Sequence, residues 1–376
     1  MTRARAVIDL NAVGHNLALI RAAAPNSQVL AVVKADAYGH GLVQIAKAAR
    51  AAHADYLGVA LLNEAVELRE AGDDGPLLAW LWTPGDPDLL ECLKRNVQIS
   101  VSSMWSLIEV TQAAAQAGTV ARIHVKLDTG LSRNGADEEE WDELFAAAKA
   151  LQSRGRIEVV GIWSHLANAS LENDSSIARQ RARFLDGVAR AKAAGIEPQL
   201  LHLANSGGAL AYPDTQFDMV RIGIAMYGVS PLDPHSAQRF DLRAVMSLHA
   251  KLAHVKTIRA GQSVSYGGTW TASEPTRIGL VPIGYADGIP RAAQDAHVMV
   301  NGVQCEVLGR VAMDQFVISL PDAVGEVAAG DDVVIFGDSS DGTPSADSWG
   351  SASNTIGYEI VTRIGSRIPR EYQGQS

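Results

Sequence analysis

One lysine of this chain stands where a buried strand would end. The apolar run Val29–Val33 leads directly into Lys34, and Tyr38 follows four residues later. Such runs are typical of parallel strands buried on both faces, and the carboxyl ends of those strands carry the sites of α/β sheets and barrels. Burial lowers the pKa of a lysine, which prepares its amine to form a Schiff base. Alternatively, a lysine at a strand end is purely structural, with its charge in water and its stem on the core.

A second set of polar residues and glycines follows other expected strands. In chain order these are Lys126, Arg133, His165, His202, Ser206, Arg221, Gly223 and Ile224. Because the carboxyl ends of barrel strands meet on one face, we expect these residues to lie together. Glycine lets the backbone approach an anion, and free N–H groups at a helix start bind phosphate, so Ser206–Gly208 and Gly223–Ile224 with Tyr38 predict a phosphate site. Taken singly, each segment also fits an ordinary tight turn, and His165 fits a core histidine.

Several motifs along the chain resemble those of one enzyme family. The sequence VVKADAYGHG, Val32–Gly41, strongly resembles the lysine motif that binds pyridoxal phosphate (PLP) in the alanine racemases. Ser263–Trp270 resembles the family's catalytic-tyrosine motif, Ile283–Gly288 its entrance tyrosine, and Gly309–Gln315 its loop for the substrate carboxylate. The resemblance spans nearly the whole chain, from Asp9 to Pro369. It implies PLP-dependent interconversion of L-alanine and D-alanine, which supplies D-alanine for peptidoglycan.

The resemblance also assigns roles to individual residues. Racemisation requires that a proton leave one face of the α-carbon and another arrive on the opposite face, and two bases within hydrogen-bond reach meet this need. By resemblance, Lys34 serves the D-enantiomer and Tyr266 the L-enantiomer. The implied cofactor contacts are Lys34, Tyr38, His165, Ser206, Arg221, Gly223, Ile224 and Tyr358. The implied substrate contacts are Arg133, Met313 and Tyr285, with two supporting residues, Lys126 (carbamylated in many family members) and His202.

Three alternatives remain open at this point. The arginine loop reads Leu131-Ser132-Arg133-Asn134-Gly135, where many family members have methionine first and leucine fourth, and Gly357 stands where a larger polar residue is expected. These departures leave a racemase of serine or of a broader range of amino acids as an alternative. A PLP-dependent decarboxylase is disfavoured because Arg221 suits a weak electron sink. A non-catalytic PLP-binding protein is disfavoured by the second domain, which contains Tyr266.

The spacing of apolar residues predicts an α/β fold, with an N-terminal (β/α)8 TIM-type barrel and a C-terminal, mostly antiparallel β domain. The expected barrel strands are Val29–Ala35, Tyr56–Ala60, Leu77–Trp82, Gln98–Ser102, Ile123–Leu127, Glu158–His165, Leu200–Ala204 and Met219–Met226. The expected helices are Leu42–Ala52, Glu64–Ala71, Trp105–Ala117, Glu139–Ser153 and Asp174–Ala194. Asn11 is expected to cap a helix that runs to about Ala24. Beyond Gly228 the helical pattern nearly disappears, and Asp338–Asn354 is predicted to be a loop of low complexity.

The expected domains are residues 1–235, which bind PLP, and residues 236–376, which supply Tyr266 and substrate contacts. Residues 1–10 are assigned either to the first domain or beside the second. A β domain that extends away from its own barrel cannot cover the mouth of that barrel, but it can cover the mouth of a neighbour. The architecture and the resemblance therefore both predict a homodimer whose active sites are shared between chains.

The composition is that of an ordinary globular protein. Of 376 residues, 47% are hydrophobic and 20% are charged, which excludes a disordered or fibrous class. The net charge of −10, without a basic block, argues against nucleic acid or an anionic membrane as a partner. Cys92 and Cys305 are too few for a disulfide framework or a cysteine zinc site, and no metal is expected. Since no apolar run is long enough to span a membrane, we expect a cytoplasmic protein. The family resemblance implies a small amino-acid substrate.

Overall fold

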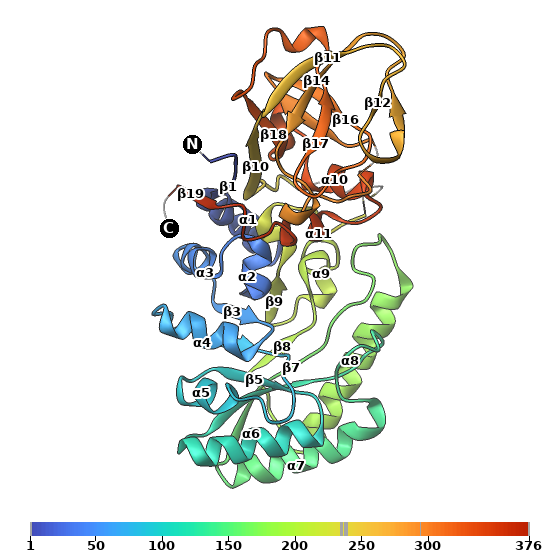
Figure 1. Cartoon of the computed structure of the whole chain (residues 1–376). Coiled ribbons are helices and arrows are strands. Elements are labelled where there is room, and N and C mark those ends of the chain that lie inside the picture. The colour runs from blue at the N-terminus through green and yellow to red at the C-terminus, as the bar shows by residue number, and fades with distance from the viewer. Residues whose placement is uncertain (1, 234–235, 237–239, 294, 375–376) are drawn as a thin grey trace.

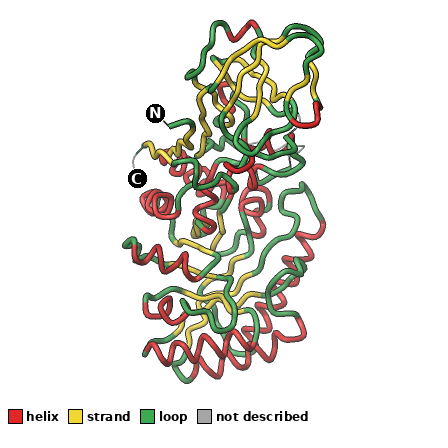
Figure 2. The backbone as a smooth tube through the Cα atoms, in the orientation of Figure 1, coloured by secondary structure: helices red, strands yellow, loops and turns green. Residues whose placement is uncertain are grey.

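The structure is a computed structural model of the chain that describes every residue except 1, 234–235, 237–239, 294 and 375–376. Figures 1 and 2 show two stacked parts: a barrel in which helices surround strands and, above it, a part made mostly of strands. The predicted domain boundary between residues 235 and 236 falls beside positions that lie outside the described residues. Within the described ranges, no helix is both long and apolar enough to cross a membrane.

Eight parallel strands form the barrel, as the sequence predicts. They are β2 (Gln28–Val32), β3 (Tyr56–Val59), β4 (Leu77–Ala79), β5 (Gln98–Val101), β6 (Ala121–Lys126), β7 (Ile157–Trp163), β8 (Leu200–His202) and β9 (Met219–Ile222). Neighbours pair in the order β8-β7-β6-β5-β4-β3-β2-β9. Between the two end strands, the amide of Asp218 donates to the Leu201 carbonyl at 3.0 Å, and the amide of Arg221 donates to the Ala204 carbonyl at 3.0 Å. The ring of strands is therefore nearly closed, and the predicted barrel is confirmed.

The alternation of side chains along the strands separates an outer core from the barrel interior. Val29, Ala31 and Val33 belong to the large core that the barrel shares with its helices. A separate cluster fills part of the interior: Leu30, Val32, Tyr56, Leu78, Val160, Leu200 and Met219. Arg221 pairs with Leu30 in the β2–β9 register, so its side chain starts from the same face of the sheet. The interior thus combines an apolar half with polar side chains.

Helices follow the strands and cover the outside of the barrel. They are α1 (Leu10–Ala23), α3 (Leu42–Ala51), α4 (Leu62–Glu70), α5 (Leu89–Lys94), α6 (Met104–Ala117), α7 (Trp141–Ser153), α8 (Ser175–Ala193) and α9 (Ser206–Ala211). All five predicted helices are present, with ends shifted by one or two residues. The cap predicted at Asn11 is wrong, because Asp9 Oδ1 accepts from the amide of Asn11 at 2.9 Å and the helix begins at Leu10.

The upper part is built on a nine-stranded sheet in the order β11-β14-β17-β16-β15-β18-β10-β1-β19. Its strands are β1 (Ala4–Asp9), β10 (Met246–Lys251), β11 (His254–Ile258), β14 (Thr276–Val281), β15 (His297–Val300), β16 (Val303–Leu308), β17 (Phe316–Ser319), β18 (Asp332–Phe336) and β19 (Arg370–Gln373). A small hairpin, β12 (Ser263–Val264) with β13 (Trp270–Thr271), stands apart. Among the described pairs of this sheet, β1 and β19 run parallel and the others are antiparallel. The first strand of the chain therefore belongs to the C-terminal sheet.

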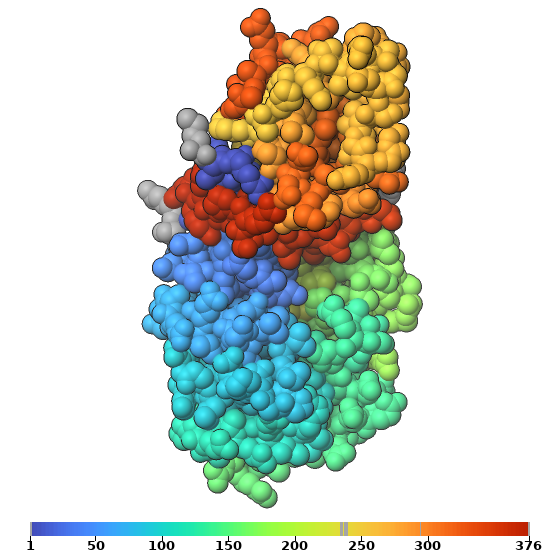
Figure 3. All heavy atoms as spheres, viewed as in Figure 1, coloured from blue at the N-terminus to red at the C-terminus, as the bar shows by residue number. Residues whose placement is uncertain are grey.

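Helix α10 (Ala346–Ala352) contradicts the expected low-complexity loop Asp338–Asn354, because it lies within that stretch. A second helix, α11 (Gly357–Thr362), follows it. The Ser345 hydroxyl accepts from the third amide of α10 at 3.1 Å, and the buried Trp349 donates from Nε1 to the Ile335 carbonyl at 2.7 Å. A cap and one buried tryptophan thus order a segment rich in serine and glycine. In Figure 3, the red C-terminal residues spread across the boundary between the blue start of the barrel and the yellow-to-orange sheet.

The short 3-10 turns are η1 (Glu138–Glu140), η2 (Pro213–Thr215), η3 (Ile224–Tyr227), η4 (Tyr266–Gly268), η5 (Tyr285–Asp287), η6 (Asp322–Val324) and η7 (Ser339–Asp341).

Candidate active site

Lys34 begins a left-handed turn just after the first barrel strand. This turn, α2 (Lys34–Gly39), has positive φ angles of 51° to 55° across Ala35–Tyr38. The left-handed conformation costs roughly 1–2 kcal/mol for each non-glycine residue, so the surrounding contacts must hold it. One such contact is the hydrogen bond from the Ala35 amide to Glu64 Oε1 at 2.6 Å. Backbone strain of this kind, maintained by its neighbours, is common at functional sites.

The surroundings of Lys34 favour its neutral amine. Burial lowers the pKa of Lys34, and the positive charge of Arg133 lowers that pKa further, whereas Glu64 acts in the opposite direction. A neutral lysine amine is both a nucleophile and a proton acceptor. Arg133 itself lies in the exposed loop after β6, where Asp128 Oδ1 organises the backbone by accepting from the Gly130 amide at 2.8 Å.

A group of hydroxyl and amide donors lies beside the α2 turn. The amide of Gly223 donates to Ser206 Oγ at 3.0 Å, and a Cβ atom at this glycine would lie 2.4 Å from Tyr38 Oη. A larger residue at this position would displace the Tyr38 hydroxyl. Burial raises the pKa of Tyr358, and the proximity of Tyr38 raises it further. Ile224 begins η3 directly after the glycine. The structure therefore brings together the residues predicted to bind phosphate, including one from the C-terminal helix α11.

Arg221 is buried among carbonyl groups at the end of the last barrel strand. Its NH1 donates to the His202 carbonyl at 3.0 Å and lies 3.4 Å from Nδ1 of the same histidine. Its NH2 donates to the carbonyls of Ser164 and Leu203, at 2.8 and 3.1 Å, and lies 3.2 Å from His165 Nδ1. Burial lowers the pKa of Arg221 to about 9, so the guanidinium remains protonated at neutral pH. Because these bonds to the described residues all come from NH1 and NH2, the Nε–H group remains as the donor for a ligand.

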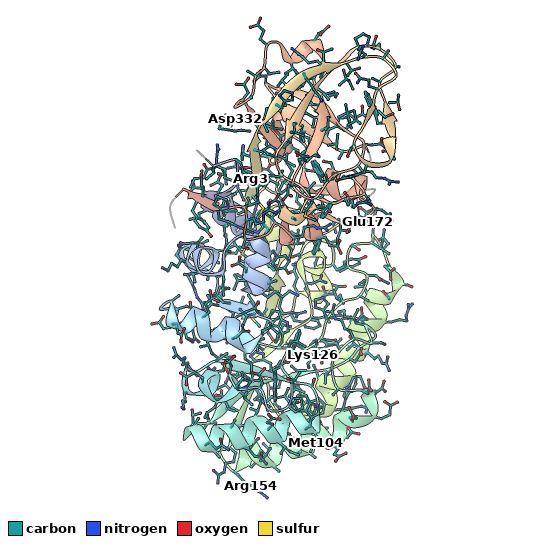
Figure 4. All side chains as sticks on the ribbon, viewed as in Figure 1. Arg3, Met104, Lys126, Arg154, Glu172 and Asp332 are labelled. Carbon is teal, nitrogen blue, oxygen red and sulfur yellow. The ribbon has the colours of Figure 1, made fainter. Side chains whose placement is uncertain are left out.

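Lys126 lies within the barrel, at the end of β6 (Figure 4). Its amine is 4.4 Å from the centroid of the Trp163 ring. Burial is the main cause that lowers the pKa of Lys126 to about 7, and the charges of Arg221 and Arg133 add to this effect. A large share of the molecules therefore carry a neutral amine at this position near pH 7.

Three predicted residues lie instead on the sheet-rich part of the chain. The exposed fractions of their side chains are 69% for Tyr266, 39% for Tyr285 and 53% for Met313. Hydrogen bonds join the segments that carry them. The Ser265 hydroxyl donates to the Arg310 carbonyl at 2.5 Å, and the amide that follows Tyr285 donates to the Met313 carbonyl at 3.0 Å. These three residues therefore belong to one connected set of exposed turns.

Within one chain, this exposed set is separated from the barrel residues. Figure 1 shows β12, which directly precedes the Tyr266 turn, on the upper part of the molecule, well away from α2, which begins at Lys34. The structure thus brings the predicted cofactor residues together at the barrel, with Lys126 and Arg133 close to them. It does not bring Tyr266 to Lys34 within one chain.

The chain is similar to known proteins over its whole length. Residues 8–231 match the alanine racemase N-terminal domain, and residues 245–372 match the alanine racemase C-terminal domain. An alanine racemase of Beutenbergia cavernae is 49% identical over 372 residues, which cover 99% of this chain and 98% of that protein. The chain belongs to the alanine racemase family.

Solved structures of other alanine racemases have the same fold. The crystal structure of the enzyme from D-cycloserine-producing Streptomyces lavendulae aligns with a TM-score of 0.96 and 48% identity, covering 100% of this chain and 98% of that one. The alanine racemase of Clostridium difficile aligns with a TM-score of 0.90 and 31% identity, covering 99% and 96%. The barrel and the sheet-rich domain are therefore features of this alanine racemase family.

The alanine racemase motifs did not point to two buried polar residues behind the site. His124 Nδ1 lies 2.9 Å from His202 Nε2, and His124 Nε2 lies 2.6 Å from Gln98 Oε1. A signal for the histidine existed, because it precedes Lys126 by two residues in one strand and so faces the same side. Gln98 had no comparable signal, since its partner comes from another strand and they meet only in the assembled barrel.

Proposed function

We propose that this chain is an alanine racemase that binds PLP and interconverts L-alanine and D-alanine. The observation that carries the proposal is the group around Lys34: an amine of lowered pKa, a buried arginine with one N–H left for a ligand, and a glycine amide beside two hydroxyl groups. Full-length similarity to proteins named alanine racemase supports the same substrate. The proposal includes a cytoplasmic role in supplying D-alanine for peptidoglycan, which rests on the family resemblance alone.

The residues present at the barrel fit PLP. Lys34 would bind the aldehyde carbon covalently, and the Nε–H group of Arg221 would face the ring nitrogen. His165 would lie against the ring. The phosphate would be held by the donors beside the α2 turn, which are Tyr38, Ser206, Gly223, Ile224 and Tyr358. When bound, the cofactor withdraws electrons from an attached amino acid and so acidifies its α-carbon.

Arg221 limits which reaction is favoured. An arginine can only donate hydrogen bonds, so the Nε–H of Arg221 would donate to the ring nitrogen of a bound cofactor and disfavour its protonation. The electron demand of the ring is then weaker than it would be opposite a carboxylate. This setting favours brief proton removal and return over transamination or decarboxylation. His202 supports the arginine by accepting from NH1 through its carbonyl oxygen.

Two bases on opposite faces of the α-carbon carry out the proton transfers. Lys34 Nζ removes the proton from D-alanine, and Tyr266 Oη supplies a proton on the opposite face, which gives L-alanine. The reverse reaction uses the same groups in exchanged roles. Arg133 would hold the substrate carboxylate together with the backbone of Met313, and Tyr285 would line the entrance.

The separation of the two sets of residues within one chain supports a second copy of the chain as the partner that completes each site. We assign residues 1–235 to the cofactor-binding barrel, except for β1, which lies in the sheet of the other domain, and residues 236–376 to the domain that supplies Tyr266. In a head-to-tail pair, the exposed turns with Tyr266, Tyr285 and Met313 cover the barrel mouth of the neighbour. Exposed aromatic and methionine side chains are typical of such interfaces. The proposed assembly is a homodimer with two shared sites.

The decisive test of function is an optical assay on purified, PLP-loaded protein. With L-alanine and with D-alanine as separate starting substrates, the circular dichroism signals should converge to zero, because a racemase brings both enantiomers to the same equal mixture. L-Serine and D-serine serve as the comparison. If serine racemises at the rate of alanine, the broader-range alternative holds. If neither amino acid loses its signal while PLP remains bound, a non-catalytic PLP-binding protein is indicated.

Carbamylation of Lys126 is expected to depend on pH. Carbon dioxide reacts with the neutral amine, and because the pKa of Lys126 is lowered to about 7, the reactive form predominates above pH 7 and declines below it. The resulting negative charge would hold Arg133. Carbon-13 NMR of protein equilibrated with labelled bicarbonate should show a carbamate signal at pH 8 that weakens at about pH 6. The Lys126→Met protein is the matched control, and an identical spectrum from it would contradict the assignment.

A further inference from the structure

We propose that Gln98 and His124 are positioning residues at the far end of a directional hydrogen-bond chain that runs from Arg221 through His202. The chain sets the tautomers of both histidines and thereby keeps an acceptor opposite the guanidinium that holds the cofactor ring. The role given to Arg221 rests on the proposed function, whereas the geometry of the hydrogen-bond chain does not depend on it. None of the family motifs described above includes Gln98 or His124.

The hydrogen-bond chain crosses the interior of the barrel and joins residues on four strands. Arg221 on β9 reaches Nδ1 of His202 on β8 at 3.4 Å, and Nε2 of that histidine lies 2.9 Å from Nδ1 of His124 on β6. The other ring nitrogen of His124 lies 2.6 Å from Oε1 of Gln98 on β5. All four residues are at most 4% exposed. Water therefore does not compete for these hydrogen bonds, and each proton position depends on its neighbours.

The direction of the chain follows from the arginine, which has no acceptor. Since Arg221 can only donate, Nδ1 of His202 must carry the lone pair, and the proton of this neutral ring is on Nε2. That proton is donated to Nδ1 of His124, so the neutral ring of His124 carries its own proton on Nε2. The last proton is donated to the carbonyl oxygen of Gln98. The amide orientation at one end and the arginine at the other thus require the same two tautomers.

Both histidines are held in the neutral state that this chain needs. Burial lowers the pKa of His124 to about 3 and holds the pKa of His202 well below its usual value, and the charge of Arg221 acts in the same direction on both. The ring of His202 also stacks on Trp163, with centroids 5.5 Å apart and planes inclined by 2°. The stacking fixes the ring plane, while the hydrogen bonds fix which nitrogen is protonated.

Gly161 is a residue outside the hydrogen-bond chain whose lack of a side chain leaves room for it. The glycine lies on β7, between the strands that carry the two histidines. A Cβ atom at this position would lie 2.4 Å from Nδ1 of His124, the atom that accepts from His202. Its φ angle is not in the left-handed region, so backbone conformation does not require glycine here. Glycine at position 161 is therefore explained by the space that the His124 ring occupies.

The tautomers determine what Arg221 can donate to. If His202 carried its proton on Nδ1, an N–H group would face the NH1 group of the arginine, and both would be donors. The guanidinium would lose one of its acceptors and face a second donor at NH1, while its bonds to the carbonyls of His202, Ser164 and Leu203 would remain. Gln98, which touches neither cofactor nor substrate, therefore acts on the site through two intermediate rings.

The test compares two substitutions at Gln98. If Gln98 only fills space, one variant should be the more active; if it sets the tautomers, the other should be. Gln98→Leu keeps the approximate shape but removes the acceptor, whereas Gln98→Glu keeps an acceptor and buries a charge. If Gln98 only fills space, the leucine protein should be the better one, because a buried carboxylate is costly. If Gln98 sets the tautomers, the glutamate protein should keep a lone pair on Nδ1 of His202 and the leucine protein should lose this bias.

The readout is the nitrogen-15 spectrum of the imidazole rings in the PLP-loaded protein, recorded with labelled histidine. In the wild type, Nδ1 of His202 should have the shift of an unprotonated nitrogen. Gln98→Leu should move this shift toward the protonated value and lower kcat by about tenfold, as expected when a buried donor loses its acceptor, with little change in KM. Val101→Ala is the matched control, since Val101 lies on the same strand but packs into the outer core rather than into the barrel interior. It should leave both histidine spectra unchanged.

Gly161→Ala provides a second route, because a methyl group there displaces His124 while Gln98 remains. It should disturb the same two histidine signals. Unchanged shifts of His202 in both Gln98→Leu and Gly161→Ala, or a leucine protein that outperforms the glutamate protein, would overturn the proposal. If the shifts change as expected but no variant or wild-type protein racemises alanine, the hydrogen-bond chain stands and the proposed function fails.

Discussion

Replacing Lys34 with alanine is expected to abolish alanine racemisation, with a loss of several orders of magnitude. The amine of Lys34 has a lowered pKa and lies at the start of the strained α2 turn. In the proposed function it is both the attachment point of the cofactor and one of the two bases. The racemisation rate and the visible absorbance of the purified protein measure the two losses. Lys192→Ala, at an exposed position in the last turn of α8, is the matched control and should behave as the wild type.

The attachment is tested separately from the rate. Borohydride reduction followed by dialysis should fix the cofactor to the wild-type chain and leave the Lys34→Ala chain unmodified, as mass spectrometry of the peptides would show. A Lys34→Ala protein that still carries covalently reduced cofactor on another residue would contradict the assignment of this lysine.

Removing the hydroxyl of Tyr266 is expected to affect the two enantiomers differently. Tyr266→Phe keeps the exposed ring and loses the group that exchanges protons on one face of the α-carbon. Solvent deuterium incorporation into L-alanine should fall by several orders of magnitude, because Tyr266 is the base proposed for that proton. Incorporation into D-alanine, which begins at Lys34, should fall less. Equal and mild losses for both enantiomers would show that Tyr266 is not a base.

The barrel could be predicted because its signals are local. Each parallel strand is a short apolar run, such as the one that ends at Lys34, and each intervening helix has its own periodicity. The left-handed turn Ala35–Tyr38 could not be predicted, since none of its residues is a glycine. It is held by Glu64, a side chain from elsewhere that accepts from Ala35, and by Asp36 of the turn itself, which accepts from the amide of Leu42 at 2.7 Å. Contacts of this kind exist only after folding.

The same distinction applies to the site. Residues at strand ends, such as Arg221, were recognisable because strand ends converge in a barrel. Gly357 was noted only as a departure from the family, and the structure gives its physical reason. A Cβ atom there would lie 2.3 Å from Oδ1 of Asp347, and that carboxylate accepts from the amides of Ser230 and Gly357 itself. A partly buried aspartate from helix α10 thus takes the space that a larger residue would need.

The central claim is that each active site combines Lys34 of one chain with Tyr266 of another, and mixing two inactive proteins tests it most directly. Lys34→Ala and Tyr266→Phe proteins, combined in equal amounts under conditions that exchange subunits, form hybrid dimers with one doubly damaged site and one intact site. Racemase activity should recover to about a quarter of the wild-type value if pairing is random and the sites act independently. If exchange is demonstrated with labelled subunits and activity stays at the level of the parent proteins, each site belongs to a single chain and the claim is wrong.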